Sequence, residues 1–192
     1  MSGTQHTAVP ALSDLDERYG ACRVPKEVRD WEIDVKPKSL VRLTEDVGAK
    51  LRSYRILAQD GLFWNVSQCS SLIWAMNGIG EVFLAFEELV FDLGVGSGAS
   101  KLKYGYPRRR GFPSHPADEK KLGHPTLVGE GSARIAGELF LDVEAEKLHW
   151  FVNCGSGRYC RDIQPSAEQG RAIHQLFIEF IDDEVRFDDP FQ

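Results

Sequence analysis

The chain has 192 residues, of which 42% are hydrophobic and 27% charged, a balance typical of a folded globular protein and not of a disordered one. Its formal net charge of −6 argues against nucleic acid as a partner, because proteins that bind the phosphate backbone usually carry a positive surface. The apolar runs are short and interrupted by charge, and residues 1–20 lack the features of a Sec signal peptide, so we expect no membrane span and a location in the cytoplasm or delivery by another route.

Residues 1–22 are polar and rich in small side chains, which predicts a flexible N-terminal arm. We expect the rest, residues 23–192, to form a single globular α+β domain. At its start, Trp31, Ile33 and Val35 alternate with polar residues, which indicates a short extended piece. A helix is expected after Pro37.

Three hairpins are predicted in the middle of the chain. The first covers residues 53–66, where apolar residues flank a Gln-Asp-Gly turn. The second covers residues 71–86 and turns at Asn77-Gly78, a pair that readily adopts positive φ angles. The third has arms at 134–143 and 148–153, joined by the charged sequence Glu-Ala-Glu-Lys.

The long segment 94–123 separates the second and third hairpins and is rich in glycine, proline and charge. Loops of this length are often functional. Its glycine-rich start, 94–100, lacks the Gly-Lys-Ser/Thr sequence of a phosphate-binding P-loop. Residues 101–112 combine five basic residues with aromatic ones, so they form either a solvated loop or a local anion site.

The C-terminal region predicts an amphipathic helix. Ser166 is a suitable N-cap, with Gln169 three residues later to complete a capping box. Apolar residues then recur at helical spacing, at Ile173, Leu176, Phe177, Phe180 and Ile181. The resulting fold class is α+β, with antiparallel hairpins forming a sheet that this helix covers, and residues 185–192 supplying an edge strand.

Four cysteines occur, at positions 22, 69, 154 and 160. Without a secretory signal, and in a chain long enough to fold without cross-links, we expect free thiols. Five residues separate Cys154 from Cys160, which is not a zinc-binding spacing, so no metal site is predicted.

The candidate site combines the ends of the third hairpin. His124 and Thr126 precede it, and Glu138 lies in its first arm. The sequence after its second arm supplies Gly155, Ser156, Gly157, Arg158 and Tyr159. Because a hairpin returns the chain to its start, we expect both groups at one end of the sheet, around a shared hollow.

The glycines of this motif would adopt unusual φ angles and bring backbone amides close to a ligand, while Arg158 offers a planar fork for phosphate or carboxylate. The alternative is that the glycines only form the turn, Arg158 caps the sheet and Glu138 faces solvent.

Three short steps occur in this order within residues 70–181: His-Pro-Thr-Leu at 124–127, Ala-Gly-Glu-Leu at 136–139 and Ser-Gly-Arg-Tyr at 156–159. This order resembles a domain shared by plant IQ-motif calmodulin-binding proteins and bacterial toxin-like proteins, which has a His-Ser-Ser-like step and ends in Ser-Gly-His-Tyr, a proline and a helix. The chain departs from that pattern, because Arg158 replaces the histidine and Pro125-Thr126 replaces Ser-Ser. No IQ motif is evident, and the resemblance implies no defined reaction.

Two functions of different classes follow. The first is an effector or toxin-type catalytic domain, ADP-ribosyltransferase-like and acting on NAD as cofactor. Arg55 would hold the pyrophosphate, Thr126 the ribose, and Glu138 would stabilise the oxocarbenium-like centre. The second is a non-catalytic acidic module, an immunity or regulatory protein for a basic protein partner. A hydrolase using His124 and a cysteine ranks last, because no nucleophile–base motif is present.

Overall fold

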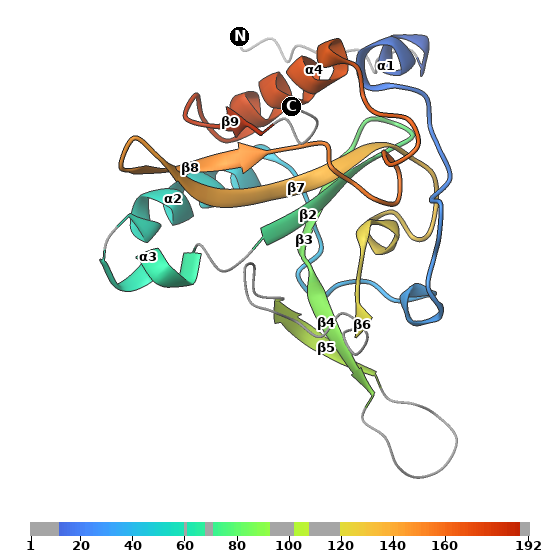
Figure 1. Ribbon diagram of the computed structural model, residues 1–192, viewed down its shortest axis with the longest axis horizontal. Coiled ribbons are helices and arrows are strands. Elements are labelled where there is room, and N and C mark those ends of the chain that lie inside the picture. Colours follow the sequence, from blue (N-terminus) through green and yellow to red (C-terminus); the bar gives the residue numbers. More distant parts are fainter. Residues whose placement is uncertain (1–11, 60, 68–70, 93–101, 108–119, 189–192) are drawn as a thin grey trace, which may run out of the picture.

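The computed structural model describes residues 12–59, 61–67, 71–92, 102–107 and 120–188 (Figure 1). Its helices are α1 (Leu12–Tyr19), α2 (Glu45–Ala58), α3 (Gly61–Ser67) and α4 (Ala167–Phe180), with short 3₁₀ helices η1 (Asp30–Glu32) and η2 (His124–Leu127). A mixed sheet of mostly antiparallel strands packs against helices, so the predicted α+β class is confirmed. None of the described helices is long and apolar enough to cross a membrane.

The main sheet has six strands in the order β1-β3-β2-β7-β8-β9. These are β1 (Val41–Arg42), β2 (Ser71–Asn77), β3 (Val82–Phe86), β7 (Ala133–Glu144), β8 (Lys147–Val152) and β9 (Arg186–Phe187). β9 pairs in parallel with β8 and forms the edge strand that the C-terminal sequence predicts. A smaller sheet, β5 (Leu102–Pro107), β4 (Glu88–Asp92) and β6 (Lys120–Lys121), follows β3 after the single residue Glu87.

The second and third predicted hairpins are confirmed as β2–β3 and β7–β8. The first of their turns differs in detail, because Gly80 and not Asn77-Gly78 has the positive φ, of 86°. Asn77 instead holds the turn with its side-chain Oδ1, which accepts from the amides of Ile79 at 3.1 Å and Glu81 at 2.9 Å. The β7–β8 turn has positive φ at both Ala145 and Glu146, as a two-residue type I′ hairpin requires.

The hairpin predicted over residues 53–66 is wrong, because this stretch is helical. Thr44 caps α2 by accepting from the Val47 amide at 3.3 Å, and Leu51 then faces the core one turn later. Helix α2 ends at Ala58 and helix α3 begins at Gly61, so two helices stand where two strands were expected. The extended piece predicted at 31–35 is also wrong, since residues 30–32 form η1, and the helix expected after Pro37 begins only at Glu45.

Part of the predicted flexible arm is ordered. Residues 12–19 form α1, whose Leu15 and Tyr19 are buried against the core. Arg134 on β7 is also buried, forms a salt bridge with Asp16 and donates to the carbonyl of Gly20 at 2.9 Å. A buried guanidinium needs such partners, and the partners come from the segment that the sequence indicates to be loose.

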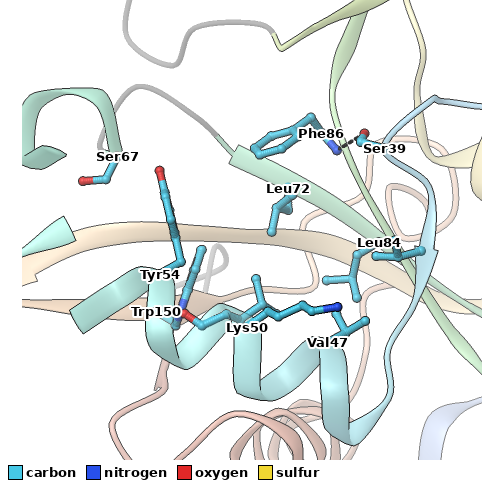
Figure 2. Close-up of a pocket in the computed structure, with 11 residues that line it drawn as sticks. Ser39, Val47, Lys50, Tyr54, Ser67, Leu72, Leu84, Phe86 and Trp150 are labelled. Carbon is cyan, nitrogen blue, oxygen red and sulfur yellow. Dashed lines mark hydrogen bonds between the residues drawn. The ribbon is translucent and has the colours of Figure 1, made fainter. Parts of the chain in front are cut away.

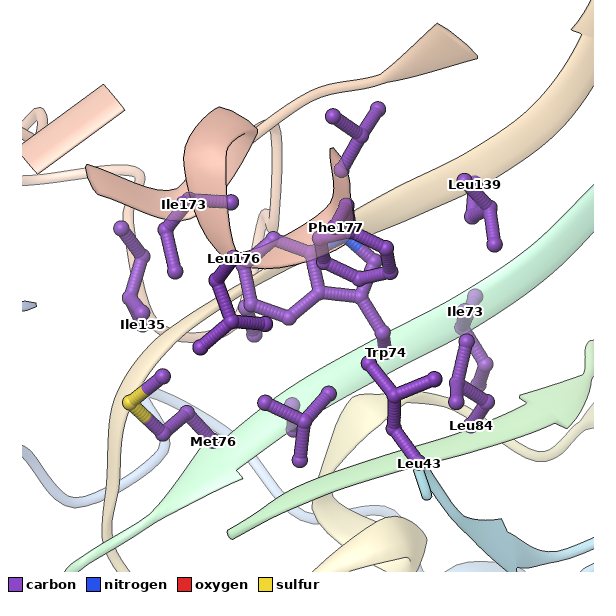
Figure 3. Packing of buried hydrophobic residues seen from close by; sticks show 14 of the residues in the cluster. Leu43, Ile73, Trp74, Met76, Leu84, Ile135, Leu139, Ile173, Leu176 and Phe177 are labelled. Carbon is purple, nitrogen blue, oxygen red and sulfur yellow. The ribbon is translucent and has the colours of Figure 1, made fainter. Parts of the chain in front are cut away.

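The main core lies between the sheet and helices α1, α2 and α4. Figure 3 shows the part of it between the sheet and α4. The ring of Trp74 on β2 meets that of Phe177 on α4 edge to face, 5.4 Å between centroids. Trp150 on β8 donates its indole N–H to the Leu51 carbonyl of α2 at 3.0 Å. Figure 1 shows α1 and α4 side by side along the sheet, and the small sheet β4–β5–β6 projects away from them.

Helix α4 is as predicted. Ser166 Oγ accepts from the Gln169 amide at 3.2 Å, and Gln169 Oε1 accepts from the Ser166 amide at 3.0 Å, which completes the capping box. The apolar stripe faces inward, with Ile173, Leu176, Phe177 and Ile181 buried and Phe180 partly buried.

The chain that leaves strand β8 crosses very close to strand β7 at Gly137, and this crossing shapes the site described below. A Cβ at Gly137 would lie 1.8 Å from the Asn153 carbonyl oxygen, so only glycine lets the chain cross there. The indole N–H of Trp74 points at this crossing and is shared between the carbonyls of Glu138 at 3.3 Å and Asn153 at 3.2 Å.

We expect Gly137→Ala to lower the free energy of unfolding by about 3 kcal/mol or more, because a methyl group cannot fit against the backbone without moving a strand. Urea denaturation measures the change. Gly157→Ala is the matched control, since a Cβ there meets nothing within 4 Å, and its midpoint should stay near that of the wild type. Equal midpoints for the two variants would contradict the close crossing.

Candidate functional site

A charged cleft of about 440 Å³ lies where five segments meet. Its walls come from residues 26–32, which we call the N-terminal strap, from Glu87 between β3 and β4, from the end of β6 and the start of η2, from β7 and from the turn 155–161. Five basic side chains line it, those of Lys26, Arg29, Lys121, Arg158 and Arg161. Four carboxylates line it as well, those of Glu27, Glu32, Glu87 and Glu138, together with His124.

The structure brings five of the candidate residues to this cleft, namely Glu138, His124, Gly155, Gly157 and Arg158. The two ends of the third hairpin therefore converge as the sequence indicates. The unusual φ angles expected for Gly155 and Gly157 are not seen, since neither is among the described glycines with positive φ.

Three further candidates sit behind the wall. Thr126 is fully buried and donates its hydroxyl to the Gly123 carbonyl at 2.7 Å. Ser156 is buried, and its Oγ accepts from the amides of Arg158 and Tyr159, both at 3.3 Å. The Tyr159 hydroxyl donates to the Gly131 carbonyl at 2.8 Å, and burial raises the pKa of this phenol. These three groups shape the walls and do not line the cleft.

Arg55 lies elsewhere. It occupies the last turn of α2, where it pairs with Asp182 at 3.0 Å and reaches the Leu148 carbonyl at 3.4 Å. The role predicted for it required a strand at this position, and the segment is a helix. Arg55 therefore ties α2 to the C-terminal segment and does not line the charged cleft.

Glu32 is the deepest charge in the cleft, with none of its side chain exposed to solvent. Its Oε1 accepts from the Gly123 amide at 2.9 Å, and its Oε2 accepts from the Arg29 amide at 2.8 Å. Arg158 Nη2 lies 3.4 Å from the same Oε2. One carboxylate thus joins the strap, η2 and the turn 155–161.

Arg158 is held on both sides. Its Nη1 donates to the Glu27 carbonyl at 2.7 Å and lies 3.3 Å from the Glu27 carboxylate, while its Nη2 faces Glu32. The strap amide of Lys26 donates in turn to the Arg158 carbonyl at 2.8 Å. The charge of this guanidinium is therefore balanced within the protein, and its main effect is to bind the strap to the turn.

His124 is almost fully buried, and its Nε2 lies 2.9 Å from the Gly137 carbonyl oxygen. Burial lowers the pKa of this imidazole to about 4, so the ring is neutral at pH 7. A carbonyl can only accept, so Nε2 carries the hydrogen and Nδ1 keeps its lone pair. Nδ1 has no hydrogen-bond partner among the described residues, which leaves an acceptor at the cleft wall.

Glu138 projects from a fixed backbone. Its amide donates to Asn153 Oδ1 at 3.0 Å, and its carbonyl accepts from the Asn153 amide at 3.0 Å. Its half-buried side chain lines the cleft beside His124 instead of facing open solvent. A carboxylate on a rigid strand is well suited to stabilising positive charge that develops in a bound ligand.

A second cavity, of about 350 Å³, lies between α2 and the sheet (Figure 2). Its walls are mostly apolar, with Leu72, Leu84 and Phe86 from the sheet and Val47 from the helix. Tyr54 and Trp150 form an aromatic pair in it, 6.2 Å between ring centroids. Among the described residues that line it, only Lys50 and Tyr54 are titratable, so the charged cleft is the stronger candidate for chemistry.

The described cysteines, Cys22, Cys154 and Cys160, are free thiols, as predicted. Cys160 is buried and its Sγ lies 3.5 Å from the Ala136 carbonyl oxygen, and burial raises the pKa of this thiol. A raised pKa disfavours the reactive thiolate form, so the environment of Cys160 does not support the hypothesis of a cysteine hydrolase. Among the described residues, no cluster of three His, Cys, Asp or Glu side chains is placed to hold a metal ion.

Sequence reasoning missed most charged residues of the cleft, including Glu32, Glu87, Lys121 and Arg161. Arg161 could have been found, because it lies only two residues after the Ser-Gly-Arg-Tyr stretch. Nothing local marks Glu32 as buried, since two of its three partners, Gly123 and Arg158, lie far along the chain. The predicted basic stretch 101–112 lies largely outside the residues whose side chains the structure describes, as does the glycine-rich 94–100.

Comparisons of the chain with family models, with curated proteins and with solved structures find no match.

The low pKa of His124 predicts an acid-sensitive fold. The unfolded chain takes up this proton near pH 6.5 and the folded chain only near pH 4, so acidification between these values favours unfolding. We expect the wild type to lose about 3 kcal/mol of stability through this group as the pH falls across that window.

His124→Gln keeps a donor for Gly137 but does not titrate. It should be less stable than the wild type at pH 7, and the gap should close by pH 4.5. Urea denaturation at both pH values measures the gap. A gap that stays constant with pH would show that His124 is not held neutral by burial.

Proposed function

We propose that this protein is a toxin- or effector-type catalytic domain that binds NAD in the charged cleft and transfers its ADP-ribose group. The observation that carries the proposal is that Glu138, His124 and several basic side chains share one cleft. The toxin-type assignment rests on the resemblance within residues 70–181 described above.

The mixture of charges suits this ligand. NAD has a cationic nicotinamide ring at one end and a pyrophosphate in the middle, so its site needs both carboxylates and basic groups. The cleft offers both, and its volume of about 440 Å³ lies within the range of about 300–1,000 Å³ usual for small-ligand sites.

Glu138 would take the catalytic role. As the bond between ribose C1′ and nicotinamide breaks, the electron pair leaves with nicotinamide and positive charge develops on the ribose, until a nucleophile of the target, or water, forms the new bond to C1′. A fixed carboxylate stabilises that charge more in the transition state than in the ground state, which is what accelerates the reaction.

The other roles fall to residues different from those first expected. Basic side chains of the cleft replace Arg55 as the phosphate site, because Arg55 is paired with Asp182. His124 replaces Thr126 at the ribose, since its Nδ1 can accept from a ribose hydroxyl.

The acidic binding module has less support. Some carboxylates of the acidic C-terminal segment already have partners within the chain. Asp182 pairs with Arg55, and Glu184 lies 3.1 Å from His149 and 3.5 Å from Arg186. Fewer free carboxylates then remain there for a basic partner.

We expect Glu138→Gln to lower the rate of nicotinamide release from NAD at least about 100-fold, because it removes the stabilising charge but keeps the shape. The dissociation constant for NAD, measured by calorimetry, should change much less. Glu144→Gln is the control, a carboxylate on the same strand that does not line the cleft, and its rate should match that of the wild type.

Two outcomes would contradict the proposal. In one, the wild type neither binds nor cleaves NAD, and binds a basic protein tightly, which would favour the acidic module. In the other, Glu138→Gln cleaves NAD as fast as the wild type, which would place the chemistry elsewhere.

A further inference from the structure

The basic side chains of the cleft are not equivalent, because most of them already have partners. Lys26 forms a salt bridge with Asp162 at 2.9 Å, and Lys121 forms one with Glu87. Such paired charges have less attraction left for a ligand, since a new anion must compete with the carboxylate already there.

Two further basic side chains of the cleft, Arg29 and Arg158, also have partners within the protein. Arg29 lies 3.6 Å from a carboxylate oxygen of Glu27 and rests over the Trp31 ring at 5.3 Å. Arg158 is held by Glu27 and Glu32, as described above. Arg161 is the remaining basic side chain of the cleft, and no hydrogen bond or ion pair joins it to any of the described residues.

Arg161 follows directly on a rigid turn. The buried Ser156 accepts from the amides of Arg158 and Tyr159, and its carbonyl accepts from the Cys160 amide at 2.9 Å. Tyr159 and Cys160 are themselves buried, which anchors the turn from behind. The exposed Arg161 thus starts from a fixed backbone, and a preorganised donor loses less freedom when a ligand binds.

We infer that Arg161 is the anion-recognising residue of the cleft, taking a phosphoryl group of the ligand through its planar guanidinium, while Arg158 is a strut between the strap and the turn. This inference rests on the proposed function for the identity of the ligand, but not for the anion site itself. A guanidinium presents two parallel N–H donors to phosphate, which a lysine ammonium cannot do.

The test measures binding by calorimetry with three probes, ADP-ribose, inorganic pyrophosphate and adenosine, the last of which carries no phosphate. We expect Arg161→Gln to weaken ADP-ribose and pyrophosphate binding about tenfold or more and to leave adenosine binding unchanged. Arg161→Lys should fall between the wild type and Arg161→Gln, because it keeps the charge but loses the fork.

Two control variants bracket this effect. Lys26→Gln removes a paired cation from the same cleft, and should weaken ADP-ribose binding less than about threefold. Arg171→Gln removes an exposed arginine on α4, outside the cleft lining, and should bind every probe as the wild type does.

The results separate this inference from the proposed function. Wild-type protein that binds pyrophosphate through Arg161 but not ADP-ribose would support the anion site and contradict the NAD proposal. Equal ADP-ribose affinity in wild type and Arg161→Gln would overturn the anion site and leave the NAD proposal standing. Equal losses for adenosine and ADP-ribose, or no binding of pyrophosphate and ADP-ribose to the wild type, would also overturn the anion site.

Discussion

The buried carboxylate of Glu32 is the interaction on which the charged cleft depends. A charge without solvent contact is costly unless it is fully paired, and removing one partner of such a pair typically costs about 3–5 kcal/mol. Glu32 meets this need with two backbone amides and one guanidinium, each from a different part of the cleft. The strap, η2 and the turn 155–161 therefore assemble together. A Cβ at Gly123 would lie 2.8 Å from Glu32 Oε1, so a larger residue there would have to displace this carboxylate.

The sheet supplies the other constraint, at the crossing of Gly137 and Asn153. This crossing frees the Gly137 carbonyl for His124 and fixes the backbone of Glu138 through Asn153. Trp74 donates a hydrogen bond to the same crossing from the core side, where its ring also packs on Phe177 of α4. Trp74 thus contributes both to core packing and to site geometry, so a substitution of Trp74 should also change the geometry of the cleft.

The sequence predicted most features that depend on residues close together along the chain, and missed most of those that join distant residues. The hairpins β2–β3 and β7–β8 and the capping box of α4 depend on neighbours a few residues apart, so local patterns found them. The first predicted hairpin failed because apolar runs around an Asp-Gly pair fit two helices with a break as well as two strands. Hairpin geometry alone predicted that the segments 124–126 and 155–159 meet, and His124 and Arg158 do line one cleft, whereas Thr126 and Tyr159 lie behind its wall. Burial of Glu32 could not be predicted in this way, since its bond to Gly123 spans 91 residues.

The charged side chains of the cleft are mostly paired with one another. This pairing allows many charges to be held close together with few left over. Arg161 is left without an ion-pair partner among the described residues, and it shares the cleft with the carboxylate of Glu138 and the imidazole of His124. This set is compact and of mixed sign, and it suits a small ligand of mixed charge better than an extended polymer.

Amide hydrogen exchange in Glu32→Gln tests most directly whether this one carboxylate holds the cleft together. The account predicts that the amides of Arg29 and Gly123 lose most of their protection, while those in the centres of β2 and β7 keep theirs. Glu27→Gln, which alters the exposed partner of Arg158, should leave both sets as they are. Unchanged protection at Arg29 and Gly123 in Glu32→Gln would contradict the account.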